Sequence, residues 1–245
     1  MNILICNDDG IESNGLKTLA EKFALKHNVL VVAPDKNWSA CSHLLSINDA
    51  IEITEYKGIK GCTAYKISGS PVDCVKIARH VFSDFIPSAV ISGINRGHNL
   101  GSDILYSGTV AIAYEAAFFG IPSFAFSAFS HGESDFELYS DYCMDIFEKL
   151  ITKTNAGGIW NVNFPESSKI IAGIKITPLS KSVYADKYIK TEDGKLKLFG
   201  IEHHNALSSD CDLFWNDLGY ITVTPLVYDK TDYNAINSIG EICIK

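Results

Sequence analysis

Asp8 and Asp9 are the residues best placed for chemistry, because they stand side by side after the apolar run 3–6 and before Gly10. A buried parallel strand reads as a continuous apolar run, so the run predicts a central strand that presents both carboxylates at its C-terminal end. Adjacent carboxylates disfavour each other's ionisation, and a divalent cation held by hard oxygen ligands relieves that cost. The structural alternative is an ordinary Asp-Gly turn in which Asp9 or Asn14 caps the next helix.

Two other loops carry oxygen donors. Ser39 lies in the polar loop that follows the apolar run 28–33, and Asn95 lies in the glycine-rich loop that follows the apolar run 88–92. In open α/β sheets, ligands bind outside the carboxyl ends of the parallel strands. We therefore expect both side chains to approach the two aspartates. Such an oxygen set favours Mg²⁺, Mn²⁺ or Ca²⁺ over zinc.

The junction Ser107-Gly108-Thr109 precedes an apolar segment, 110–119, that reads as a helix. The free N–H groups at a helix start, together with two hydroxyls, form a phosphate-binding cradle. Plain N-capping is the alternative for a serine or threonine at this position. A cation that polarises a phosphoryl oxygen, beside donors for the other oxygens, meets the physical requirement for phosphate ester hydrolysis.

A strand, helix and strand pattern over residues 3–33 positions the first of these loops. The helical spacing of apolar residues in 13–27 separates two apolar runs, which predicts a parallel βαβ unit. We also expect strands at 50–56, 63–68, 88–92, 123–127, 159–164, 171–178 and 220–226, helices beginning at Ser70 and spanning 110–119 and 135–153, and a hairpin over 184–198 turning near 192–194.

The predicted fold class is therefore α/β: a Rossmann-like, mostly parallel sheet flanked by helices, with a C-terminal β-hairpin and arm extension. Residues 1–165 are expected to form the catalytic core. Helical periodicity disappears after Pro165, and a hairpin is marginal alone. We therefore expect residues 166–245 to supply the hairpin and arm that lie on the core or on another subunit.

Composition narrows the function classes. The 245 residues are 47% hydrophobic, enough for a large core, and the net charge of −8 argues against nucleic-acid polymers and anionic membranes as partners. The seven cysteines are odd in number and form no Cys-x-x-Cys pair, which favours reduced thiols and a cytoplasmic location. The apolar stretch 109–129 contains Glu115, Gly120 and Pro122, so it reads as a helix followed by a strand and not as a membrane span.

Four motifs in order resemble one family. They are NDDG at 7–10, APD at 33–35 followed by Ser39, SGIN at 92–95 and NLGSDILYSGT at 99–109. Together with the later segments WNVNFP and ITVTPL, they are similar to the SurE (survival protein E) family of metal-dependent 5′-nucleotidases, over nearly the whole chain.

The resemblance implies hydrolysis of nucleoside 5′-monophosphates, often also 3′-monophosphates, and sometimes of short polyphosphate. It implies one divalent metal ion per subunit, Mg²⁺ or Mn²⁺, and homodimers or homotetramers that exchange the arm and hairpin. The implied catalytic residues are Asp8 and Asp9, the implied metal ligands are Asp8, Asp9, Ser39 and Asn95, and the implied phosphate contacts are Asn99, Ser107, Gly108 and Thr109. The nucleophile stays open between a water or hydroxide activated near the metal and direct attack by Asp8 or Asp9.

Three positions depart from the family pattern. Trp38 stands where arginine is more common, which removes a positive charge from the Ser39 loop, and Ala40 stands where glycine is more common. His98 stands where proline is usual. It could protonate a leaving alcohol, but an exposed loop histidine is more often inert, so it is not among the candidate site residues.

Other classes fit less well. A phosphate-accepting receiver module needs a third aspartate where this chain has Asn95, and a nicotinamide-binding dehydrogenase needs a glycine-rich turn after the first strand. A non-catalytic metal-dependent nucleotide-binding protein remains open. Release of phosphate from a nucleoside monophosphate, with and without a chelator, separates it from the enzyme.

Overall fold

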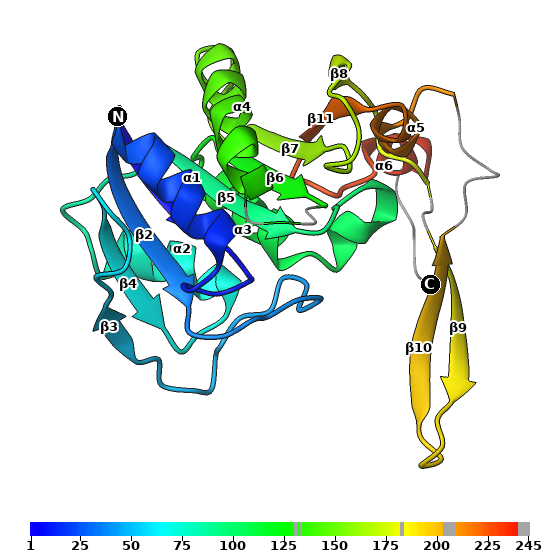
Figure 1. Ribbon diagram of the computed structural model, residues 1–245, viewed down its shortest axis with the longest axis horizontal. Helices are drawn as coiled ribbons and strands as arrows, with labels where there is room; N and C mark the ends of the chain where they lie inside the picture. Colours follow the sequence, from blue (N-terminus) through cyan, green and yellow to red (C-terminus); the bar gives the residue numbers. More distant parts are fainter. Residues whose placement is uncertain (130–131, 133, 182–183, 203–208, 240–245) are drawn as a thin grey trace.

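The computed structural model describes residues 1–129, 132, 134–181, 184–202 and 209–239. A nine-stranded sheet runs through the main body, in the order β3-β4-β2-β1-β5-β6-β7-β11-β8, and a separate two-stranded sheet pairs β9 with β10 (Figure 1). The elements are β1 (Asn2–Cys6), α1 (Asn14–Ala24), β2 (Asn28–Pro34), β3 (Ile53–Glu55), β4 (Thr63–Ile67), α2 (Pro71–His80), β5 (Ala89–Arg96), the 3-10 helix η1 (Gly101–Leu105), α3 (Gly108–Phe118), β6 (Ser123–Ala128), α4 (Ser134–Ile151), β7 (Ile159–Phe164), β8 (Gly173–Ile176), β9 (Tyr184–Lys190), β10 (Leu196–Glu202), α5 (Asp212–Asp217), β11 (Tyr220–Leu226) and α6 (Tyr233–Ile239).

The order of the parallel strands creates the place where a ligand fits. Strands β2 and β4 lie on one side of β1, and strands β5, β6 and β7 lie on the other side. These six strands are parallel to one another. The direction of winding therefore reverses between β1 and β5. Ligands of such sheets bind at this reversal, outside the carboxyl ends of the strands. Asp8 follows β1, and Asn95 lies within the last two residues of β5, which extends to Arg96 and not only to the predicted residue 92, so both lie at this reversal.

Two helical layers bury the two faces of the sheet. Ile3 and Ile5 of β1 pack with α1 and α4, while Leu4 and Cys6 face the other way and pack with α2 and α3. Successive side chains of a strand point to opposite faces, so a strand covered on both sides must be apolar throughout. This explains why the first strand is readable as an uninterrupted apolar run.

The predicted core elements are confirmed, with differences at the periphery. The strand expected at 50–56 is only Ile53–Glu55, an exposed edge strand antiparallel to β4. The expectation that helical structure ends at Pro165 is wrong, because α5 and α6 follow it. Both are short, six and seven residues, and too brief to show a 3.6-residue repeat.

Only part of the segment after Pro165 is separate from the main sheet. Strands β8 and β11 join the nine-stranded sheet, β11 antiparallel to β7. The hairpin of β9 and β10 instead projects from the body as its own ribbon (Figure 1). Residues 203–208 and 240–245 of the predicted arm lie outside the described residues. The division into core and oligomerisation segment stays a prediction.

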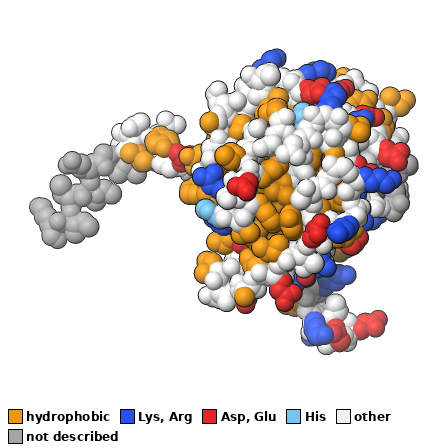
Figure 2. All heavy atoms as spheres, turned by 90° about the vertical axis from the view of Figure 1, so that its left-hand side faces the viewer, with side chains coloured by type: hydrophobic (Ala, Val, Ile, Leu, Met, Phe, Trp, Pro, Cys, Tyr) orange, Lys and Arg blue, Asp and Glu red, His pale blue; other side chains and the backbone are white. Residues whose placement is uncertain are grey.

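The stretch 109–129 folds as predicted, α3 followed by β6. In the described part of the chain, no helix combines the length and the apolar character needed to cross a membrane. On the face opposite the hairpin, over the β3–β4 end of the sheet, Figure 2 shows hydrophobic side chains gathered at the centre and charged ones around them.

Candidate active site

Asn7 shapes the turn that presents the two aspartates. Its amide donates to the Gly10 carbonyl at 3.0 Å and to the Ser13 hydroxyl at 2.8 Å, and its side-chain oxygen accepts from the Gly10 N–H at 3.2 Å. Gly10 adopts a φ of +101°, which favours glycine. Ser13 caps α1, so the alternative in which Asp9 or Asn14 serves as the cap is wrong. The turn thus leaves both carboxylates available.

Asp8 is held against the start of α3. Its carboxylate is buried and accepts a hydrogen bond from the Thr109 hydroxyl. A Cβ on Gly108 would lie 2.8 Å from Asp8 Oδ2 and 3.0 Å from Cys41 Sγ, so only glycine permits this approach. Burial raises the pKa of Asp8, although hydrogen bonds from Thr109 and the Gly108 backbone oppose the rise.

Asp9 is the second acid and takes backbone and amide donors. Its Oδ2 accepts from the Arg96 N–H at 3.1 Å, and its Oδ1 lies 3.4 Å from the Asn37 amide nitrogen. Burial and then the charge of Asp8 raise the pKa of Asp9 to about 6, while Arg96 opposes the rise. Across the described residues, neither aspartate pairs with a Lys or Arg side chain.

The loop after β2 brings Ser39 to the same place. The Trp38 N–H donates to the Asp8 carbonyl at 2.8 Å, which ties the loop to the end of β1. The hydroxyl and N–H of Ser39 donate to Asn37 Oδ1 at 2.6 and 2.7 Å, and the amide of Asn37 faces Asp9. Ser39 is thereby linked to Asp9 through one side chain, with the lone pairs of its hydroxyl free to accept or to bind a cation.

Asn95 completes the predicted set. Its amide nitrogen donates to the Gly97 carbonyl at 2.9 Å, which leaves its side-chain oxygen with no protein partner among the described residues. Asp8, Ser39 and Asn95 line one pocket of about 730 Å³. Asp9 lines a neighbouring pocket of about 450 Å³, and Arg96 lines both. We call Asp8, Asp9, Ser39 and Asn95 the oxygen cluster.

Asn99 is anchored by two asparagines of β7. Its N–H donates to Asn163 Oδ1 at 2.8 Å, and its carbonyl accepts from the amides of Asn161 at 2.8 Å and Asn163 at 3.1 Å. Its side-chain amide donates to the Ser127 hydroxyl at 2.8 Å. The WNVNFP motif therefore positions the glycine-rich loop, a role that the motif alone did not reveal.

The residues predicted to contact phosphate divide into two groups. Asn99 and Ser107 line the 730 Å³ pocket, and Ser107 also caps α3 by accepting from the Val110 N–H at 3.1 Å. Thr109 is fully buried, and its hydroxyl is used by Asp8. The capping alternative is thus true of Ser107, yet its side chain still reaches the pocket.

Several pocket residues were not anticipated from the sequence. Arg96 and Asp103 supply opposite charges, and Tyr188 and Leu198 of the hairpin line the same pocket. Arg96 could have been found from its place beside Asn95, whereas the two hairpin residues carry no local signal. His98 is half-buried and lines the pocket, so the expectation of an exposed loop histidine is wrong.

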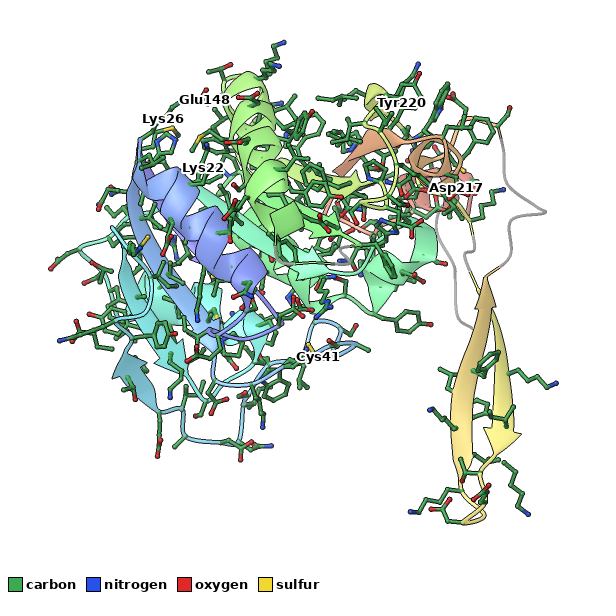
Figure 3. All side chains as sticks on the ribbon, in the orientation of Figure 1. Lys22, Lys26, Cys41, Glu148, Asp217 and Tyr220 are labelled. Atoms are coloured by element: carbon green, nitrogen blue, oxygen red, sulfur yellow. The ribbon has the colours of Figure 1, made fainter. Side chains whose placement is uncertain are left out.

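Two nearby groups, Cys41 and Glu115, are poor candidates for catalysis. Cys41, labelled in Figure 3, lies in the loop after β2, and burial together with Asp8 raises the pKa of its thiol to about 11. A thiol this hard to ionise is a poor nucleophile. Glu115 pairs with Lys76 at 2.7 Å and with His43 at 2.9 Å, so it is a structural partner within α3 and not a base.

Comparisons with known proteins find similar chains of one family. The family model described as Survival protein SurE matches residues 3–186. The 5′-nucleotidase SurE of Clostridium botulinum (strain Eklund 17B / Type B) is 41% identical over 253 residues, covering 99% of each chain. That of Thermoanaerobacter sp. (strain X514) is 38% identical, covering 100% of this chain and 99% of its own. The crystal structure of the SurE protein from Aquifex aeolicus superposes with a TM-score of 0.79 at 35% identity, covering 98% of each chain.

Proposed function

The chain belongs to the survival protein SurE family and is a 5′-nucleotidase, and we propose that it cleaves nucleoside 5′-monophosphates, and also 3′-monophosphates, with one divalent cation held at the oxygen cluster. The single observation that carries this proposal is the convergence of Asp8, Ser39 and Asn95 on one pocket that Asn99 and Ser107 also line. A cation site and a phosphate cradle therefore share one cavity.

The residues present fit such a cation. Two adjacent carboxylates lack a Lys or Arg partner in the described residues, and burial raises the pKa of both. This is the electrostatic state that a divalent charge relieves. No group of three or more His, Cys, Asp or Glu side chains gathers in the described part of the chain, so neutral oxygens must complete the shell. Oxygen ligands alone favour Mg²⁺ or Mn²⁺ over zinc.

Different side chains of the pocket then bind different oxygens of the phosphate. When bound, the cation polarises a phosphoryl oxygen and offsets the charge of the substrate. Asn99 and Ser107 lie where they can donate to the other phosphoryl oxygens, and the start of α3 adds the positive end of its dipole. Arg96 also lines the pocket, and its positive charge offsets part of the negative charge of the phosphate. Asp8 and Asp9 are the carboxylates at the cluster that can accept a proton from the attacking water.

A panel of phosphate-release assays tests the proposal. Nucleoside 5′- and 3′-monophosphates are incubated with the full chain in Mg²⁺, in Mn²⁺ and in EDTA. We expect turnover with either metal and none in EDTA. Binding of nucleotide without any phosphate release would instead identify the non-catalytic nucleotide-binding alternative.

The hairpin supports a second part of the proposal, assembly into a homodimer or homotetramer by exchange of the arm. Tyr188, Leu196, Leu198 and Phe199 are each at least half exposed on a two-stranded sheet. A hairpin of two strands is marginal alone and needs a covering surface. Light scattering on the wild type and on Leu196→Lys tests this. We expect the variant to shift toward monomer, and an unchanged mass would count against the exchange.

A cytoplasmic location is also proposed. Six cysteines in the described residues are free, which suits a reducing compartment. Fractionation of cells that produce the chain is expected to place the phosphate-releasing activity in the cytosolic fraction, and recovery in an extracellular fraction would oppose it.

A further inference from the structure

His98 is a pocket residue whose hydrogen bonding is incomplete. Its Nε2 lies 2.8 Å from the Phe164 carbonyl, an acceptor, so Nε2 carries the proton and donates. Its Nδ1 has no protein partner among the described residues. Nδ1 is also absent from the set of fully buried polar atoms without a partner, so it keeps some exposed surface. Nδ1 is therefore not fully enclosed, and His98 is one of the residues that line the 730 Å³ pocket.

The surroundings of the ring favour its neutral form. Burial is the main effect and lowers the pKa of His98 below its ordinary value, although the hydrogen bond to Phe164 opposes this. The charged groups that act on the ring are Lys169, which lowers the pKa, and Asp217 and Glu166, which raise it. With the proton on Nε2, a neutral imidazole presents Nδ1 as a hydrogen-bond acceptor.

A hydrogen-bond acceptor at this position restricts which group of the substrate can bind there. The lone pair of Nδ1 cannot form a hydrogen bond with a phosphate dianion, which has only acceptors, so the bound group must contain a hydrogen-bond donor. Ribose hydroxyls are donors, and His98 is the neighbour in sequence of Asn99, which lies on the phosphate side of the pocket. Tyr188 and Leu198 form an apolar part of the lining, which suits the flat face of a base.

We propose that His98 Nδ1 accepts a hydrogen bond from a ribose hydroxyl and makes this chain prefer ribonucleotides to the matching deoxyribonucleotide. The inference rests on the proposed nucleotidase function and assigns His98 as a specificity-determining residue of that site. Removal of the hydroxyl leaves the acceptor unpaired in a partly desolvated place, which costs transition-state binding.

The test compares kcat/KM for adenosine 5′-monophosphate with its 2′-deoxy and 3′-deoxy analogues. We expect the wild type to disfavour one analogue about tenfold, and the analogue affected identifies the hydroxyl. His98→Leu should reduce that ratio to near one. His98→Gln should restore part of it, because its amide can donate to Phe164 and accept from the sugar. His80→Leu, at an exposed histidine on α2, is the matched control and should keep the wild-type ratio.

Equal use of all three nucleotides by the wild type would overturn the assignment, as would full discrimination in a folded His98→Leu protein. If that variant does not fold, calorimetry on the wild type decides. We expect adenosine to bind more tightly than 2′,3′-dideoxyadenosine, and equal affinities would overturn the proposal. Absence of phosphate release from every nucleotide contradicts the nucleotidase function instead, while the nucleoside binding data still test His98.

Discussion

The hydroxyl of Thr109, at the start of α3, donates a hydrogen bond to the carboxylate of Asp8, at the end of β1. The two residues are 101 positions apart in the sequence, and both are buried. Thr109 therefore orients Asp8 through its hydroxyl, while its predicted contact with phosphate stays a prediction. The packing of Asp8 against the start of α3 depends on Gly108, where a side chain would collide with Asp8.

Replacement of Thr109 by valine removes this hydrogen bond and keeps the shape of the side chain. We expect kcat/KM for a nucleoside monophosphate to fall about tenfold and the affinity for Mn²⁺ to weaken, because Asp8 loses its orienting donor. Thr109→Ser keeps the hydroxyl and should stay close to wild type. Steady-state kinetics and metal titration provide the measurements, and wild-type values in a folded valine variant would contradict the role given to Thr109.

Asn163 is predicted to matter more than Asn161 for the glycine-rich loop. Asn163 exchanges two hydrogen bonds with the backbone of Asn99, whereas Asn161 makes one. Asn163→Ala should lower the free energy of unfolding by about 2–3 kcal/mol and raise KM, and Asn161→Ala should cost about 1 kcal/mol. Chemical denaturation and kinetics on both variants check this. Equal effects would show that the loop does not depend on the paired contact.

The pKa of Asp9 predicts how the metal-free protein responds to pH. The folded-state pKa is about 6, above the ordinary value of 3.8, so folding disfavours the ionised form. The contribution of Asp9 to the free energy of unfolding is fully present below about pH 4. It is lost as the pH rises through 6, which lowers the free energy of unfolding by up to about 3 kcal/mol. Melting temperatures in EDTA from pH 4 to 8 should fall accordingly.

Asp9→Asn should flatten that decline, and Mg²⁺ or Mn²⁺ should stabilise the wild type more at pH 8 than at pH 5. The same slope in Asp9→Asn and in the wild type would assign the pH dependence to another group.

Ala40 adopts the left-handed conformation with φ of +59°, which an alanine rarely takes. Ala40→Gly should therefore raise the free energy of unfolding by about 0.5–1 kcal/mol. Ser42 is a matched control, because its φ is +56° but its hydroxyl donates to the Leu105 carbonyl at 2.6 Å. Ser42→Gly relieves strain and loses that bond, so we expect no net gain. Thermal melts compare the two, and no stabilisation by Ala40→Gly would contradict the strain argument.

The sequence predicted the doubly covered sheet from local patterns, and it placed Asp8, Ser39 and Asn95 at the sheet edge where they line one pocket. Their role as metal ligands, with Asp9, stays a prediction. Residues 3–6 of β1 form an uninterrupted apolar run. Asp8 follows β1, Ser39 follows β2 and Asn95 lies near the end of β5, so topology places all three at one edge of the sheet. The sequence could not show that Thr109 serves Asp8, because helix capping and phosphate binding select the same residue types.

Contacts between distant segments escaped prediction for a related reason. Tyr188 lines the pocket although it belongs to the hairpin. The sequence of the hairpin predicts only that its two strands pair with each other. The half-buried ring of His98 bonds to the Phe164 carbonyl, 66 residues away. Helices α5 and α6 are too short for a periodic signal.

The most direct measurement of the central claim is phosphate release from adenosine 5′-monophosphate by wild type, Asp8→Asn and Asp9→Asn in Mn²⁺. Each variant keeps the size of the side chain and removes one charge from the oxygen cluster. We predict that both retain the far-UV circular dichroism of the wild type and lose about a thousandfold in kcat. Wild-type turnover by either folded variant would contradict a cation-dependent reaction at Asp8 and Asp9.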